Sequence, residues 1–156
     1  MLQPVVIDGI RTPIGKLNGA MKDIQPEEIA AFLLQKICER SHLDIRLLDA
    51  VILGQAKQSS DQPNIARLAA LITKFPLEVQ AYTVHRQCGS GMQAVQNAAQ
   101  EIMCGYADFV LAGGVESMSN AQYYLREARR GYAVVYPSHT LIHFQMLALS
   151  VNFSHR

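Results

Sequence analysis

The stretch His85–Val95, HRQCGSGMQAV, decides how the rest of the chain is interpreted. Gly89, Gly91 and Ala94 have the G-x-G-x-x-A spacing of a loop that binds a dinucleotide phosphate between a strand and a helix. Cys88 stands directly before the first of these glycines, where a helix is about to begin. The stretch therefore predicts either a phosphate-binding loop or a nucleophilic cysteine at a helix end.

Short apolar runs alternate with helical patterns on both sides of this stretch. Strands are expected at residues 5–8, 49–54, 81–84 and 108–112, the last ended by Gly113 and Gly114, and helices at about 26–42, 65–72 and 89–104. This alternation predicts an α/β fold whose largely parallel sheet is covered by helices on both faces. Ligands of such sheets bind beyond the carboxyl ends of the strands, where we expect Cys88, Gly113 and Glu116.

A dinucleotide-binding loop also needs an acidic residue about 20 positions further on, which holds a ribose. Glu116 and Asp108 are the candidates, but Asp108 begins its expected strand and so lies at the wrong end. The residues just before the glycines, HRQC, are polar where the motif usually has an apolar strand. Dinucleotide binding is therefore the weakest of the alternatives.

The nucleophile hypothesis accounts for more of the stretch. The unpaired N–H groups and the positive dipole at a helix start favour the thiolate of Cys88. Gly89 and Gly91 would leave room beside the sulfur for a thioester carbonyl, and backbone N–H groups of the turn could stabilise an oxyanion. The alternative is that Cys88 is a small buried residue, and residue chemistry alone weighs the two equally.

The other histidines and cysteines are weaker candidates. His85 lies three residues before Cys88, so on an extended strand their side chains point to opposite faces, and we expect His85 to be structural or hydrogen-bonded. Cys38 and Cys104 fall in expected helices among apolar neighbours and are interpreted as core. His139 and His143 are four residues apart, but no third ligand or acid accompanies them, so no metal site is expected.

The composition fits one ordinary soluble domain. The chain has 156 residues, of which 49% are hydrophobic and 17% charged, and its formal net charge is +1. This balance gives no electrostatic reason to expect nucleic acid or a membrane surface as a partner. Three irregularly spaced cysteines argue against a disulfide framework, and the start MLQPVVIDGIRTP lacks the pattern of a secretory signal, so we expect a cytoplasmic protein.

Four segments carry a resemblance to a known family. They are Arg11–Lys16 (RTPIGK), Asn64–Arg67 (NIAR), Cys88–Ala94 (CGSGMQA) and Gly113–Ser119 (GGVESMS). In this order they resemble the N-terminal part of a thiolase, an acetyl-CoA acetyltransferase or 3-ketoacyl-CoA thiolase. The related ketoacyl synthases share the cysteine and the Gly-Gly turn, but not the RTPIGK segment.

The resemblance implies an acyltransferase of lipid metabolism in which Cys88 accepts the acyl group of an acyl-CoA, either for Claisen condensation or for thiolysis by CoA. Substrates would be CoA thioesters, with no separate cofactor and no metal, and members of the family are homo-oligomers whose strand before the nucleophile lies near the subunit interface. The residues implied to form oxyanion sites or to shape the site are Gly89, Gly91, Gly113, Gly114, Glu116 and Ser117. The implied fold is a layered, mixed α/β sheet with helices on both faces.

The family's second half supplies further groups to the site: a histidine in a Gly-His-Pro segment, a second cysteine in a Cys-x-Gly segment and an asparagine. Neither motif follows Cys88 here, and Cys104 directly precedes Gly105, which does not fit Cys-x-Gly. Turnover needs a base to deprotonate the acyl α-carbon, so we expect slow acylation of Cys88 at most. A non-catalytic α/β fragment or interaction module is the alternative.

The organisation expected from this resemblance is a partial thiolase-like domain at residues 1–131 and an atypical tail at 132–156. The tail contains no acidic residue and resembles no part of the family, which suggests a truncated or frameshifted reading or an alternative end. The CoA-binding insertion and a fifth strand of the first half are expected to be missing. A sheet that lacks a strand exposes an edge and apolar surface, which favours aggregation or a compensating partner.

Overall fold

The structure is a computed structural model in which residues 2–124 are described. The expected domain boundary at residue 131, the tail at 132–156, and the pair His139 and His143 lie outside the described residues.

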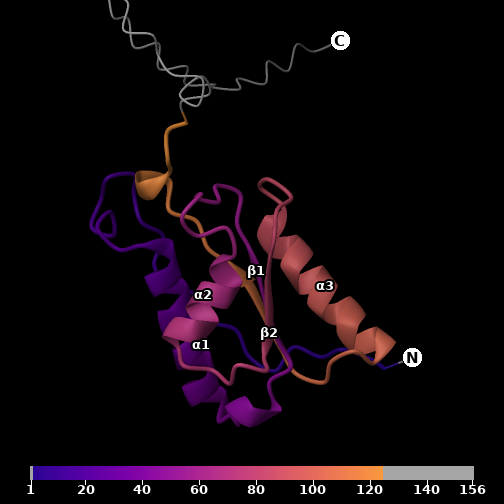
Figure 1. Ribbon diagram of the computed structural model, residues 1–156. Helices are drawn as coiled ribbons and strands as arrows, with labels where there is room; N and C mark the ends of the chain where they lie inside the picture. Colours follow the sequence, from indigo (N-terminus) through magenta and orange to yellow (C-terminus); the bar gives the residue numbers. More distant parts are fainter. Residues whose placement is uncertain (1, 125–156) are drawn as a thin grey trace, which may run out of the picture. The chain divides into compact units, whose positions relative to one another are not determined.

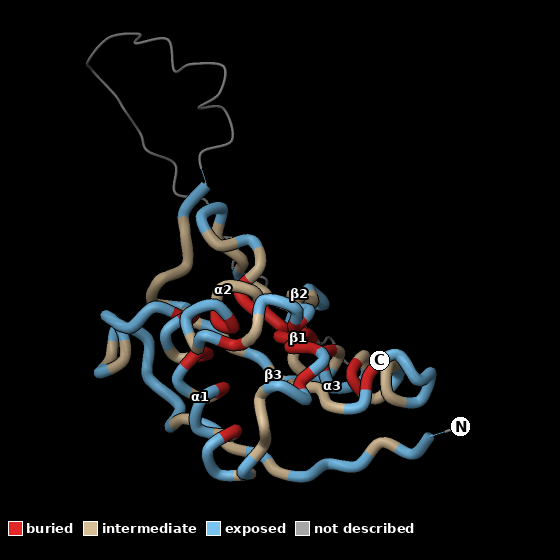
Figure 2. The backbone as a smooth tube through the Cα atoms, turned by 60° about the horizontal axis from the view of Figure 1, so that its bottom comes forward, coloured by how far each residue is buried: buried red, intermediate tan, exposed pale blue. Residues whose placement is uncertain are grey.

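Three parallel strands form the sheet. They are β1 (Ala50–Gly54), β2 (Gln80–Val84) and β3 (Val110–Gly114), in the order β2-β1-β3 (Figure 1). Ala50 of the central strand pairs with Gln80 on one side and with Val110 on the other. Every residue of β1 is buried (Figure 2), as expected for a central strand with helices on both faces.

The helices cover both faces, as predicted. α1 (Pro26–Ser41) and α2 (Ile65–Ile72) pack on one face, and α3 (Ser90–Cys104) packs on the other (Figure 1). Because side chains alternate along a strand, Val51 and Leu53 join the core beneath α1 and α2, while Ala50 and Ile52 join the core beneath α3.

Local signals explain where the helices begin and end. At the start of α1, the Glu28 carboxylate accepts a hydrogen bond from the Gln25 N–H at 2.9 Å. Asn64 caps α2, because its side-chain oxygen accepts a hydrogen bond from the Arg67 N–H at 3.1 Å. α3 ends at Gly105, whose φ of 75° lies in the left-handed region that favours glycine.

The predicted strand at residues 5–8 is wrong: residues 2–16 form no regular element. A strand needs a partner for its backbone groups, and none of the described strands pairs with this segment. Side-chain contacts hold it instead, because Arg40 of α1 binds the Asp8 carboxylate through its Nε at 2.7 Å and the Gly9 carbonyl at 2.7 Å. Gly113 and Gly114, expected to end the last strand, are its final residues.

A groove of about 940 Å³ opens between this N-terminal segment and β3, bordered by α1 and α3. β3 is at the edge of the sheet, so one side of its backbone has no partner strand among residues 2–124. Val5, Val6 and Ile7 beside the groove are 77%, 87% and 69% exposed. Within residues 2–124, an edge of the sheet and apolar side chains beside it are therefore exposed. No helix of the described part has the length and apolar content needed to cross a membrane.

Candidate active site

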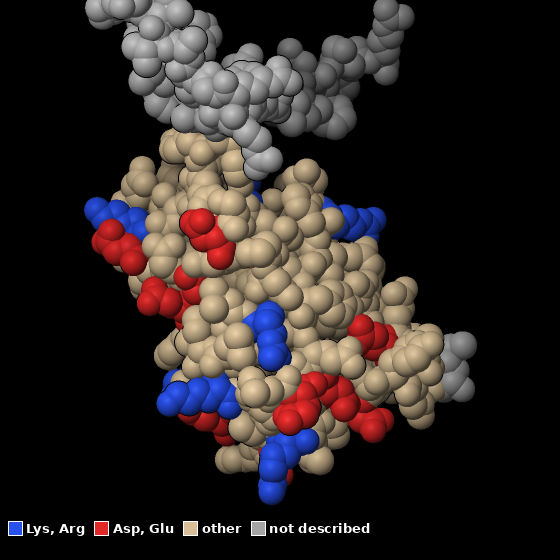
Figure 3. Space-filling model, viewed as in Figure 1, with Lys and Arg blue, Asp and Glu red and all other residues tan. Residues whose placement is uncertain are grey.

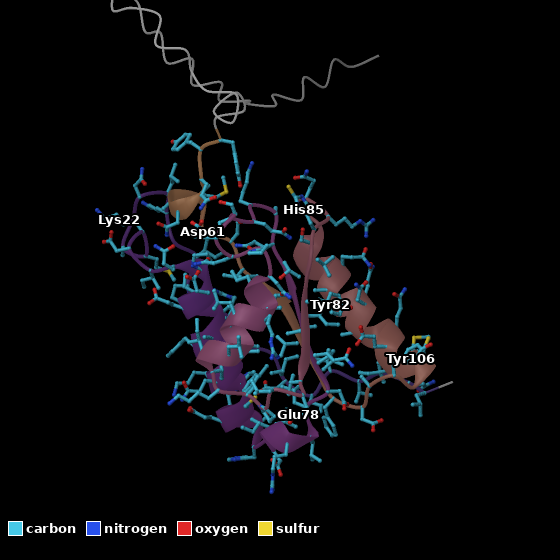
Figure 4. The ribbon with its side chains drawn as sticks, in the orientation of Figure 1. Lys22, Asp61, Glu78, Tyr82, His85 and Tyr106 are labelled. Atoms are coloured by element: carbon cyan, nitrogen blue, oxygen red, sulfur yellow. The ribbon has the colours of Figure 1, made fainter. Side chains whose placement is uncertain are left out.

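The predicted site residues lie at or beyond the carboxyl ends of the strands. Cys88 follows β2 by four residues and lies two residues before α3, separated from it by the N-cap residue Gly89, while Glu116 follows β3 by two residues. Figure 4 shows His85 at this end of the molecule, together with Lys22 and Asp61, and Glu78 and Tyr106 at the opposite end. The sheet thus gathers the loop that carries Cys88 and the Gly-Gly loop at one edge.

Cys88 lies in a tight turn that hydrogen bonds hold on both sides. The Gly89 N–H donates to the Arg86 carbonyl at 3.0 Å, and the Ser90 N–H donates to the Gln87 carbonyl at 3.1 Å. The Ser90 hydroxyl donates to the same Gln87 carbonyl at 2.6 Å and accepts from the Arg86 N–H at 2.8 Å. Gln87 has a φ of 49°, in the left-handed region that non-glycine residues rarely adopt.

The Cys88 side chain is exposed and has no hydrogen bond among the described residues. It stands beside the first turn of α3, which has no acidic residue and no side-chain cap. The N-terminal end of a helix favours a negative charge that lies beside it. The N–H groups of Gly89 and Ser90 already donate within the turn, so they are not the free oxyanion donors that we expected from this stretch.

Glycines of the site allow the backbone at the start of α3 to contact the backbone at the ends of β1 and β3. A Cβ on Gly54 would lie 2.2 Å from the carbonyl carbon of Ser90, and one on Gly114 would lie 3.1 Å from the Cα of Gly91. The atoms nearest to a Cβ on Gly91 would be those of Gly113 and Gly114, so this glycine faces the sheet rather than clearing the sulfur. Sequence analysis missed the role of Gly54, although glycine at a strand end often marks such a close approach.

Glu116 connects the loops that follow β1 and β3. Its carboxylate accepts hydrogen bonds from the Ala56 N–H at 2.8 Å and from the Lys57 N–H at 3.2 Å. Ser117, half-buried beside it, accepts a hydrogen bond at 2.9 Å from the side-chain amide of Asn120. The predicted site-shaping residues thus hold loops in place at this edge.

Two residues that sequence analysis missed extend this connection. The Asn120 amide also donates to the carbonyls of Lys22 and Ile24, at 3.0 and 3.2 Å, in the loop before α1. The Gln122 side chain accepts from Ser60 at 3.1 Å and donates to Asp61 at 2.9 Å, in the loop before α2. Neither residue belongs to a recognisable motif, since each acts through contacts with residues about 60 to 100 positions away.

A series of side-chain hydrogen bonds, which we call the polar ladder, runs along α3 from the turn that carries Cys88. Arg86 donates to Gln93 at 2.6 Å, Gln93 donates to Asn97 at 2.8 Å, and Asn97 donates to the Tyr82 hydroxyl at 3.4 Å. Tyr82 of β2 in turn donates to Glu101 at 2.8 Å, and burial, followed by this bond, raises the pKa of Tyr82. The ladder ties α3 to β2.

The remaining candidates form no hydrogen bond with the Cys88 thiol in the part of the chain that the structure describes. His85 is exposed and has no hydrogen bond in the described part of the chain, so the expected hydrogen-bonded histidine is not found. Cys38 is buried, as predicted, and burial raises the pKa of its thiol. Cys104 is exposed, so its interpretation as core is wrong: it is the last residue of α3, beyond the last buried position at Ala98. Residues 2–124 contain no group of three or more side chains suited to a metal ion.

Comparison with known proteins identifies the family. Residues 4–148 match the family model described as thiolase, N-terminal domain. The chain is 40% identical over 135 residues to the 3-oxoadipyl-CoA/3-oxo-5,6-dehydrosuberyl-CoA thiolase of Escherichia coli, covering 85% of this chain and 34% of that protein. It is 36% identical over 138 residues to the acetyl-CoA acetyltransferase of Syntrophomonas wolfei, covering 88% of this chain and 35% of that protein. The chain spans about a third of the length of these relatives.

Solved structures agree with this match. The Bacillus anthracis acetyl-CoA acetyltransferase superposes with a TM-score of 0.76 at 42% identity, covering 81% of this chain and 32% of that chain. The Acat5 thiolase from Ascaris suum, solved in complex with coenzyme A, superposes with a TM-score of 0.70 at 30% identity, covering 73% and 30% of the two chains. Sequence and fold together show that this chain belongs to the thiolase family and corresponds to its N-terminal part.

Proposed function

We propose that Cys88 is the acyl-accepting nucleophile of a thiolase-type acyltransferase that acts on acyl-CoA and CoA. The single observation that carries this proposal is the placement of Cys88, an exposed thiol at the N-terminal end of α3 in a chain of this family. Covalent catalysis of this kind divides a difficult transfer into two easier steps.

In the first step, the Cys88 thiolate attacks the carbonyl carbon of the thioester. A new carbon–sulfur bond forms, the carbonyl electrons move to its oxygen, and the bond to the CoA sulfur then breaks. CoA leaves as a thiolate, which takes up a proton from water, and the acyl group remains on Cys88. Attack by a CoA thiolate reverses these bond changes, so acyl transfer and its reversal use one site.

Three features of the edge support this step. The first turn of α3 favours the thiolate, and the exposed sulfur is open to a substrate. Glu116 holds the loop after β1, which we assign to the same site together with Ser117 and the Gly113–Gly114 turn. No separate cofactor or metal enters this step, because the thioester itself supplies the activated acyl group.

The activity proposed for the described residues is this half-reaction. Condensation also needs a base that removes the acyl α-proton, and the proposal assigns no described residue to that role. No described residue hydrogen-bonds to the Cys88 thiol either. The proposal places the chemistry in lipid metabolism. It also places the protein in the cytoplasm, where its free thiols at positions 38, 88 and 104 would stay reduced.

The test is acylation by acetyl-CoA, followed by intact-mass measurement and peptide mapping. Cys104→Ser is the starting variant, because Cys104 is a second exposed thiol that could react. We expect one acetyl adduct on Cys88 that Cys88→Ser abolishes. Absence of the adduct, or the same adduct on Cys88→Ser, would overturn the proposal.

Interaction with a partner is the second candidate function, favoured by the unpaired outer edges of β2 and β3 in the described sheet. Unpaired edges favour addition of another strand, including one from a second copy of the chain. Acidic and basic side chains are interspersed on the face shown in Figure 3, which gives no electrostatic basis for nucleic acid there. Size-exclusion chromatography with thermal melting tests this candidate, and a cooperatively melting monomer would count against it.

A further inference from the structure

The hydroxyl of Ser90 points back toward the turn instead of forward into its helix. A serine at the N-cap position accepts a hydrogen bond from an N–H two or three residues further along, but the N-cap of α3 is Gly89 and Ser90 is the first helical residue. The Ser90 hydroxyl instead donates to the Gln87 carbonyl at 2.6 Å and accepts from the Arg86 N–H at 2.8 Å. Both partners precede Cys88, so this side chain acts on the backbone that leads into the thiol.

The other side of Ser90 is fixed by the sheet. Ser90 is only 3% exposed, and its backbone packs against Gly54 so closely that a Cβ on Gly54 would lie 2.4 Å from the Ser90 carbonyl oxygen. Gly54 ends the fully buried central strand. Ser90 is therefore a rigid anchor from which its hydroxyl holds Arg86 and Gln87.

The residue that Ser90 holds is in an unfavourable conformation. Gln87 has a φ of 49°, and its side chain is exposed, so no packing of that side chain imposes the left-handed backbone. Such a conformation persists in a non-glycine residue only where the surroundings enforce it. Two hydrogen bonds into the Gln87 carbonyl, from the Ser90 hydroxyl and the Ser90 N–H, supply that constraint.

We propose that Ser90 is a positioning residue for Cys88: its hydroxyl holds Gln87 in the left-handed conformation and thereby keeps the thiol at the N-terminal end of α3. Without this hydroxyl, the turn relaxes to ordinary backbone angles and Cys88 moves away from the N-terminal end of α3, where the helix dipole favours a negative charge. The role matters for acyl transfer if the proposed function is right, but the positioning itself can be measured without acyl-CoA.

The test measures the rate at which iodoacetamide alkylates Cys88 in the full chain, with Cys104→Ser as background. Ser90→Ala should slow alkylation by roughly two- to fivefold, the range that corresponds to losing the stabilisation that a helix N-terminal end gives to a negative charge. Ser41→Ala is the matched control, because the Ser41 hydroxyl also donates to a backbone carbonyl, that of Ile37 at 2.7 Å, but in α1. It should leave the rate unchanged.

A second change separates positioning from general loss of structure. Asparagine tolerates the left-handed conformation better than glutamine does, so Gln87→Asn added to Ser90→Ala should restore most of the lost rate. An unchanged rate in Ser90→Ala, or a slowed rate that Gln87→Asn does not restore, would overturn the proposal. If Ser90→Ala loses its cooperative melt, Gln87→Val alone should slow alkylation and Gln87→Asn alone should not, and equal rates in those two variants would also overturn it.

The same variants distinguish this proposal from the proposed function. If the alkylation rates follow the expected pattern but acetyl-CoA forms no adduct on Cys88, positioning by Ser90 stands and acyl transfer fails. If acetyl-CoA acylates Ser90→Ala and the wild-type chain at equal rates and alkylation is also unchanged, acyl transfer stands and positioning by Ser90 fails.

Discussion

Gly54 and Ser90 are in direct backbone contact at the carboxyl end of the central strand. A Cβ on Gly54 would lie 2.2 Å from the Ser90 carbonyl carbon and 2.4 Å from the Gly91 nitrogen. These atoms belong to the backbone at the start of α3, which cannot move without displacing the helix. The contact therefore sets the distance between the sheet and the turn that carries Cys88.

Gly54→Ala is expected to lower the free energy of unfolding by about 3 kcal/mol or more, because the added methyl overlaps the Ser90–Gly91 backbone. Urea unfolding followed by circular dichroism measures the change. Gly9→Ala is the control, since no atom lies within 4 Å of its added Cβ, and it should unfold as the wild-type chain does. Equal unfolding midpoints for the two variants would show that the contact is absent.

Cys88 and Cys104 stand at opposite ends of α3, and both thiols are exposed. The N-terminal end of a helix stabilises a thiolate and the C-terminal end destabilises it, each by about 0.3–1 kcal/mol at the surface. Cys88 is therefore expected to react with iodoacetamide at least about threefold faster than Cys104 at neutral pH. Peptide mapping of a time course measures both rates in one sample, and faster reaction of Cys104 would contradict the placement of Cys88.

Glu116→Ala should lower the free energy of unfolding by about 1 kcal/mol, because the Ala56 and Lys57 N–H groups lose a charged acceptor. Hydrogen exchange at these two amides should accelerate at the same time. Glu78→Ala is the matched control: Glu78 is an exposed glutamate with no hydrogen bond or ion pair in the described residues (Figure 4). Unchanged exchange at positions 56 and 57 in Glu116→Ala would contradict the role given to Glu116.

The contact between Asp8 and Arg40 makes part of the stability pH-dependent. The hydrogen bond from Arg40, followed by that from the Gly9 N–H, holds the pKa of Asp8 below its ordinary 3.8. Because the folded pKa is the lower one, the stabilisation is fully present above pH 3.8 and is lost as the pH falls through the lowered pKa. Arg40→Gln should therefore be less stable than the wild-type chain near neutral pH, and this difference should shrink in acid.

Urea unfolding at a series of pH values measures this difference. Lys22→Gln removes an exposed lysine that forms no ion pair in the described residues, and it should differ little from the wild-type chain at every pH. A constant difference between Arg40→Gln and the wild-type chain across the acid range would contradict the linkage.

The three helices and three of the four expected strands were predicted correctly because their signals are local. The cap at Asn64, the early glutamates of α1 and the apolar runs of β1 to β3 each act within a few residues. The expected strand at residues 5–8 failed because a strand also depends on a partner distant in the sequence, and none of the described strands supplies one.

The candidate site, like the fold, was predicted where its signals are local in the sequence and missed where they depend on distant contacts. Cys88 and Glu116 were located correctly at the sheet edge, because strand ends can be read from the pattern. The close approach of Gly54 to Ser90 and the backward hydrogen bonds of Ser90 could not be predicted, since both depend on how α3 docks against β1. Asn120 and Gln122 were missed for the same reason, as their partners lie in distant loops.

The most direct test of the central claim, that Cys88 exchanges acyl groups with CoA, is isotope exchange between acetyl-CoA and labelled free CoA. This exchange needs only formation and reversal of the acyl-cysteine, so it does not depend on a base for the α-proton. We predict that label enters acetyl-CoA with the Cys104→Ser chain and that Cys88→Ser in that background abolishes the exchange. No exchange with the unaltered Cys88, or equal exchange without it, would contradict the account.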